Sequence, residues 1–124
     1  MYVFILGDAD RVREQVERAL LDCDFEGASS FSKSLTNALA VLVSEIEQIP
    51  GSSTILAGGD DVCFRLPEAQ YDRETLVSIA KRFFATSSCN ISFGVGRSIG
   101  AAYLNLRRAK ARGGGQIIAD EALL

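Results

Sequence analysis

The chain has 124 residues, of which 48% are hydrophobic and 23% charged, as in a single folded domain and unlike a disordered segment. It has no histidine, which excludes Ser-His-Asp and Cys-His catalytic sets and zinc sites built on imidazole. The net charge of −3 disfavours stable binding to DNA or RNA, and no apolar stretch is long enough to insert across a membrane, so we expect a cytoplasmic protein.

The N-terminal part of the chain predicts one strand followed by two helices. Residues 2–6 are a continuous β-favouring apolar run, typical of a strand that is buried on both faces. Apolar residues recur at helical spacing from residue 11 to about residue 21, and Asp10 is well placed to cap this helix. A second helix, with the longest apolar stripe in the chain, is expected after the acidic segment 22–27 and ends at the Pro-Gly pair 50–51.

The middle of the chain predicts a β-hairpin and a third helix. Residues 53–57 and 62–66 are β-favouring, and the sequence Gly-Gly-Asp-Asp between them is typical of a tight turn. Asp72 is placed to cap the third helix, whose apolar residues share one face up to about residue 83.

The last part of the chain adds a strand at 90–95, a helix at 100–112 and a short strand at 116–119. The whole order is a β-α-β-β-α-β core with an extra helix near the N-terminus and a helix-strand pair at the C-terminus. With right-handed crossovers it predicts a ferredoxin-like α+β fold, an antiparallel sheet with the first strand beside the third and helices on one face. No linker divides the chain, so we expect residues 1–124 to form a single domain.

This topology brings acidic residues together. The first strand ends at the sheet edge where the second strand turns into the third, so Asp8 should lie beside Asp60 and Asp61, with Asp10 nearby. Such a cluster repels itself unless a cation neutralises it, and ligands that are all oxygen favour Mg²⁺ or Mn²⁺. Gly58 and Gly59, without side chains, would let a triphosphate approach the backbone.

Gly-Gly-Asp-Asp by itself matches an ordinary hairpin turn at least as well as a site. Its pairing with Gly7 and Asp8 at the same predicted edge favours the site.

A second feature is a basic stretch in an acidic chain. Helical spacing puts Arg107 and Lys110 on one flank of the last helix and Arg108 and Arg112 on another. One flank can meet phosphates while the other meets solvent or a partner. A solvated helix face explains most charge runs, so Lys110 is equally well interpreted as a phosphate ligand or as a surface residue.

These features together resemble the palm domain of nucleotide cyclases: the Gly-Gly-Asp-Asp hairpin, an Asp closing the first strand, Ser-Phe-Gly-Val-Gly at 92–96, and Arg-Ala-Lys at 108–110 before a glycine-rich turn. GGDEF diguanylate cyclases share this plan, and the polymerase-cyclase subunit of type III CRISPR effectors shares it more closely. The short chain and its opening strand ending in Gly-Asp-Ala-Asp resemble most closely the minimal CRISPR polymerase family, stand-alone palm proteins of prokaryotic anti-phage loci.

The resemblance implies a two-metal nucleotidyltransferase. Asp8 and Asp60 match the metal-binding carboxylates of the palm, Asp61 is a further ligand, and the carbonyl of Ala9 matches a backbone ligand. Two Mg²⁺ per site are implied, with Mn²⁺ able to substitute. Lys110 matches the lysine that holds the substrate triphosphate.

The family makes cyclic oligonucleotides from ATP, and its minimal members are associated with cyclic dinucleotides, including a 2′,3′-linked cyclic di-AMP that a separate membrane effector reads. In this chain Asp61 stands where diguanylate cyclases have Glu, and their guanine-binding pattern is missing, which favours adenine. Closing a cyclic dinucleotide requires two opposed nucleotides, so a homodimer is expected. The expected nucleotide-binding residues are Gly7, Asp10, Phe31, Ser34, Asn37, Gly58, Gly59, Arg107 and Lys110.

Two alternatives remain from the residues alone. Phe31 is better explained by core packing than by contact with a base. The chain as a whole could be an inactive palm that binds a nucleotide or cyclic nucleotide as a sensor, or a ferredoxin-like interaction domain with no ligand.

Overall fold

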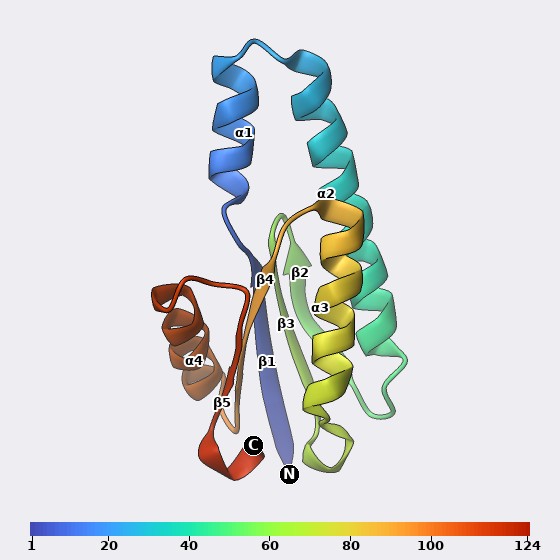
Figure 1. Ribbon diagram of the computed structural model, residues 1–124. Helices are drawn as coiled ribbons and strands as arrows, with labels where there is room; N and C mark the ends of the chain where they lie inside the picture. Colours follow the sequence, from blue (N-terminus) through green and yellow to red (C-terminus); the bar gives the residue numbers. More distant parts are fainter.

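In the computed structural model, which describes residues 1–124, five strands form one sheet in the order β2-β3-β1-β4-β5 (Figure 1). The elements in chain order are β1 (Tyr2–Ala9), α1 (Val12–Leu21), α2 (Phe25–Glu47), β2 (Ser53–Gly58), β3 (Asp61–Pro67), α3 (Arg73–Ser87), β4 (Ile91–Gly96), α4 (Ile99–Ala111) and β5 (Ile117–Ala119), with short 3₁₀ turns at Glu68–Gln70 and Glu121–Leu123.

The sheet confirms the predicted α+β topology. β1 lies at its centre and pairs antiparallel with both β3 and β4, as expected for a strand that is apolar along both faces. β2 and β3 form the predicted hairpin. The short β5 pairs with β4 in parallel, so the five-stranded sheet is mostly antiparallel rather than entirely so.

Helices cover both faces of the sheet in different ways. α2 and α3, the helices of the β-α-β-β-α-β core, pack together on one face, as predicted (Figure 1). The hydrophobic core lies between them and the sheet, and its fully buried large side chains include Ile5, Leu42, Phe64, Leu76, Phe83 and Phe93. α4 packs on the opposite face of the sheet (Figure 1). The sequence predicted helices on one face only, so this second helical layer was not expected.

The position of α4 depends on glycines in β4. Phe93 and Val95 point into the core, so the residues between and beside them face α4. A side chain at Gly94 would collide with the backbone of Ala102 and Leu106, and one at Gly96 would lie 2.7 Å from the Ala102 backbone nitrogen. The absence of side chains at these two positions therefore lets the helix backbone approach the strand closely.

The structure corrects two predicted details near the N-terminus. Asp10 does not cap α1: Arg11 occupies the cap position in the left-handed region, with φ of 58°, and no side chain caps the helix. α2 begins at Phe25, inside the segment expected to precede it, because the Asp24 carboxylate accepts a hydrogen bond from the Gly27 amide at 2.8 Å. The predicted cap of α3 is confirmed, since Asp72 accepts from the Glu74 amide at 3.1 Å.

α1 and the N-terminal part of α2 project beyond the end of the sheet at which β1 ends (Figure 1). α1 contributes no fully buried residue, and only Val12 at its start packs partly buried against the core, so most of the helix stands as an arm. None of the helices combines the length and apolar character needed to cross a membrane.

We predict that Gly94→Ala lowers the free energy of unfolding by about 1–3 kcal/mol, because the added methyl group meets helix backbone that can yield only by moving α4. Gly100→Ala is the matched control. Nothing lies within 4 Å of a Cβ at Gly100, and alanine favours the helix, so that variant should be unchanged or slightly more stable in urea unfolding. Equal stability of the two variants would contradict the packing described for α4.

Candidate functional site

The sheet brings Asp8 next to the β2–β3 turn. Asp8 is paired with Asp61 in the antiparallel register of β1 and β3. One residue further on, the Ala9 amide donates to the carbonyl oxygen of Asp60 at 2.9 Å. The predicted meeting of the first strand with the acidic turn is therefore confirmed at the level of the backbone.

Lys110 reaches this edge from the last turn of α4. Its Nζ lies 3.1 Å from Asp8 Oδ2 and 2.5 Å from Asp10 Oδ1. It also donates to the backbone carbonyl oxygens of Asp8, at 3.1 Å, and Ala9, at 3.2 Å. Lys110 is therefore directed at the acidic residues rather than into solvent, although 29% of its side chain stays exposed.

Asp10 is the buried partner of this lysine, with 9% of its surface exposed. Its carboxylate accepts from Ser92 Oγ at 2.9 Å and from the Gly115 amide at 2.7 Å, while its own amide donates to the Asn90 carbonyl oxygen at 2.8 Å. The structure thus places Asp10 inside the protein, where it fixes the position of Lys110. The sequence reasoning missed this role; the one signal that could have indicated it is Ser92, a polar residue in an otherwise apolar strand.

The charges at the site are only partly compensated. Burial is the main cause that raises the pKa of the Asp8 carboxyl. The hydrogen bond and charge of Lys110 lower this pKa, the negative charges of Asp60 and Asp61 raise it, and the result is a pKa above the ordinary value. Asp60 and Asp61 form no ion pair of their own. In this conformation no group of three or more His, Cys, Asp or Glu side chains is gathered closely enough to hold a metal ion.

The turn itself is open. Gly59 has a φ of +63°, which favours glycine, and no atom lies within 4 Å of a Cβ built at Gly58 or Gly59. Beside the turn, a cavity of about 420 Å³ separates it from α2. An adjoining ligand could contact the turn backbone without meeting a side chain.

The residues of α2 that line this cavity differ from those expected from the sequence. They are Thr36, Leu39, Ala40 and Val43. Phe31, Ser34 and Asn37 do not line it, and Phe31 packs partly buried against the core, which is the interpretation that the sequence favoured. Leu39 belongs to the apolar stripe of α2, and Thr36 is the only polar residue among the other three, so periodicity alone did not single these residues out.

A second cavity, of about 370 Å³, opens on the α4 face of the sheet. Asp8, Asp61, Arg107 and Lys110 contribute to its wall, and the remainder is mostly apolar. Gly7 also lines it, but a Cβ there would lie 2.7 Å from the Phe93 ring, so Gly7 is needed for packing in any case. Asp8 and its lysine therefore border an open cavity on one face, and the glycine turn borders another beside α2.

Comparisons with known proteins identify the family and the fold of the chain. The family model described as the minimal CRISPR polymerase domain matches residues 4–119. No curated protein matches the chain.

Several solved structures share the fold. The chain superposes on a Csm1-Csm4 cassette in complex with cA4 with a TM-score of 0.68 at 17% identity, covering 97% of this chain and 21% of that one. It superposes on the Pseudomonas aeruginosa diguanylate cyclase SiaD, in complex with its activator SiaC, with a TM-score of 0.59 at 15% identity, covering 96% of this chain and 50% of that one. For the coiled coil and GGDEF domain of DgcB from Caulobacter crescentus, in complex with c-di-GMP, the TM-score is 0.62 at 13% identity, with coverages of 96% and 69%. The chain therefore spans about a fifth of the length of the first of these relatives and half of the second. At identities this low, the similarity shows a shared fold and nothing further.

We predict that Asp8→Asn is more stable than the wild type at pH 7 in EDTA. Because the folded chain holds the Asp8 proton more tightly than the unfolded chain, Asp8 favours folding while protonated, and this contribution is lost as pH rises through the raised pKa. The difference should disappear below about pH 3.9, where the carboxyl is protonated in both states. Urea unfolding from pH 3 to pH 7 measures the difference in the free energy of unfolding between the two proteins. An Asp8→Asn variant less stable than the wild type at pH 7 would contradict the expected direction.

Proposed function

Because the chain belongs to the minimal CRISPR polymerase family, we propose that it is a nucleotidyltransferase that makes a cyclic oligonucleotide second messenger from ATP. The palm fold relates it to CRISPR polymerases and to diguanylate cyclases. The observation that carries the proposal is the placement of Asp8 opposite Asp61, with Lys110 beside them and an open glycine turn at the same edge.

The residues present fit a divalent cation. Asp8, Asp60 and Asp61, with the carbonyl of Ala9, offer only oxygen ligands, as Mg²⁺ and Mn²⁺ prefer. The pKa of Asp8 is raised mainly by burial and further by the charges of Asp60 and Asp61, and Lys110 offsets these effects only in part. When two Mg²⁺ ions are bound, they supply charge stabilisation for the attacking ribose hydroxyl, the α-phosphate and the pyrophosphate.

Lys110 would change partners when a cation and triphosphate arrive. Its contact with Asp10 is the shorter one, at 2.5 Å against 3.1 Å for Asp8, and Asp10 is the more buried of the two carboxylates. Asp8 would then be free to hold a cation, while Asp10 would keep the ammonium in place to bind phosphate oxygens. Arg107 on the same helix adds a second positive charge to the cavity.

The substrate in this proposal is cytoplasmic ATP. The triphosphate would lie along Gly58 and Gly59, and the adenine would enter the apolar cavity between the turn and α2. Asp61 in place of the Glu of diguanylate cyclases, and the missing guanine-binding pattern, support adenine over guanine. The proposed product is cyclic di-AMP, including its 2′,3′-linked form.

A second copy of the chain would complete the reaction. One palm provides one site, whereas a cyclic dinucleotide needs two nucleotides facing each other, so we propose a homodimer with opposed sites. Support comes from exposed apolar side chains near the α4-face cavity: Leu56 is 51% exposed and Tyr103 is 49% exposed. In anti-phage defence, a separate membrane effector would read the product.

A specific observation also favours a second candidate, an inactive palm that binds a nucleotide or cyclic nucleotide as a sensor. In the structure the Lys110 ammonium already pairs with Asp8, and no three acidic side chains are gathered as a metal site. Catalysis therefore requires the acidic turn to close on a cation, whereas binding alone does not.

Incubation with each NTP and Mg²⁺, followed by mass spectrometry, tests the proposal. We expect a cyclic di-AMP product from ATP, and a specific activity that falls on dilution if the dimer is the active form. Asp60→Ala should abolish turnover while leaving the melting temperature close to that of the wild type, because Asp60 forms no ion pair that stabilises the fold.

Asp22→Ala is the matched control for that variant, since Asp22 is an exposed carboxylate after α1 and should not affect turnover. ATP binding without any product from any NTP would favour the sensor. A large loss of stability in Asp60→Ala without metal would show that Asp60 is structural.

A further inference from the structure

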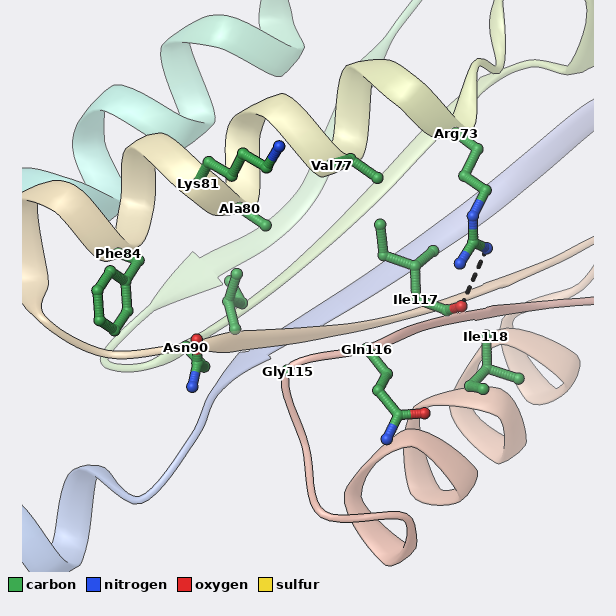
Figure 2. A pocket seen from close by; sticks show the side chains of 11 residues that line it. Arg73, Val77, Ala80, Lys81, Phe84, Asn90, Gly115, Gln116, Ile117 and Ile118 are labelled. Atoms are coloured by element: carbon green, nitrogen blue, oxygen red, sulfur yellow. Dashed lines mark hydrogen bonds between the residues drawn. The ribbon is translucent and has the colours of Figure 1, made fainter.

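The largest cavity of the molecule lies away from the acidic edge. It has a volume of about 760 Å³ and is bordered by α3, the start of β4 and the chain from Gly115 into β5 (Figure 2). We call it the α3–β5 cleft. It shares no residue with either cavity at the candidate site. Its volume lies within the range of pockets that enclose small organic ligands.

The walls of the α3–β5 cleft combine apolar and basic groups. Val77 and Ala80 of α3 face Ile117 of β5, and Phe84, with half of its surface exposed, extends from the same helix (Figure 2). Arg73 and Lys81 add two positive charges. No acidic residue lines the cleft, although the chain as a whole is acidic.

Neither basic residue is neutralised by the protein. Arg73 and Lys81 form no ion pair, and the guanidinium of Arg73 donates only to the Ile117 carbonyl oxygen, at 3.0 Å (Figure 2). They lie eight residues apart on α3, about 12 Å along the helix axis at about 1.5 Å per residue. Two unpaired cations at this separation favour an extended anion over a single small one.

We propose that the α3–β5 cleft is a second nucleotide-binding site, with the base against Phe84 and phosphates along Lys81 and Arg73. An aromatic ring offers a stacking surface to a base, and arginine and lysine bind phosphate oxygens. The apolar residues between them would cover the sugar and the faces of the base. This site does not depend on the proposed catalytic function.

The edge of β5 is less suited to an added β-strand. Strand addition uses the free carbonyl and amide groups of the edge strand. Arg73 already occupies the Ile117 carbonyl, and β5 is only three residues long. The short edge with its occupied carbonyl therefore favours the nucleotide over a peptide strand.

The cleft is connected to the candidate site through Asp10. Asn90 and Gly115 line the cleft, and both bind Asp10: the Gly115 amide donates to its carboxylate at 2.7 Å, and the Asn90 carbonyl accepts from its amide at 2.8 Å. Asp10 in turn holds Lys110. A ligand in the cleft would thus contact two residues that fix the partner of the proposed phosphate-binding lysine.

The test is an NMR titration of the ¹⁵N-labelled chain with ATP in EDTA, where no metal supports turnover. We expect saturable shifts of backbone amides from 77–84 and 115–118. Lys81→Glu should weaken this binding at least tenfold and Phe84→Ala severalfold. Arg18→Glu, the same charge change on the exposed arm α1, should leave the affinity unchanged. The cleft shifts should persist in Asp60→Ala, and amide spectra of all variants check that they fold.

Parallel titrations with cyclic di-AMP and with inorganic triphosphate distinguish the kinds of ligand that the cleft could bind. Tighter binding of cyclic di-AMP than of ATP would identify a product-type ligand, and the reverse a substrate-type ligand. Triphosphate binding as tightly as ATP, with no effect of Phe84→Ala, would overturn a nucleotide site. Shifts confined to Asp8 and 58–61, or cleft shifts caused by protein concentration alone, would also overturn it. Cleft binding in a protein that makes no cyclic product would remove the proposed function and leave this site in place.

Discussion

The ammonium of Lys110, shared between Asp8 and Asp10, is the interaction on which the acidic edge depends. Asp10 is buried, and a buried carboxylate without a partner costs several kcal/mol. The lysine can reach it only if α4 lies directly against β4 and β1, on the face opposite α2 and α3. The close approach at Gly94 and the position of Lys110 are therefore two consequences of the same packing.

This interaction compensates the edge without neutralising it. One ammonium serves two carboxylates and two backbone carbonyls, while Asp60 and Asp61 remain unpaired at the open turn. Burial is the main cause of the raised pKa of Asp8, and the charges of Asp60 and Asp61 raise it further. Uncompensated negative charge weakens a fold but attracts cations, and perturbed carboxylates beside cavities are typical of functional sites.

The sequence predicted the strands, the hairpin and the meeting of Asp8 with the acidic turn, because strand order and handedness determine which ends of strands share an edge. It did not predict the role of Asp10, since a carboxylate before a helix is usually a cap and its actual partners lie about a hundred residues away. The cavity beside α2 and the α3–β5 cleft were missed for a similar reason. Cavities arise from the spacing of packed elements, which periodicity does not encode.

The most direct test of the central claim is a double-mutant cycle in which the free energy of unfolding is measured for Asp10→Ala, Lys110→Met and the double variant, at pH 7 in EDTA. If Asp10 and Lys110 act as one unit, the effects should fail to add by about 1–3 kcal/mol, with the double variant losing less than the sum of the two single losses. Strict additivity would show that the lysine and the buried carboxylate act independently, and would contradict the account of how this edge is held together.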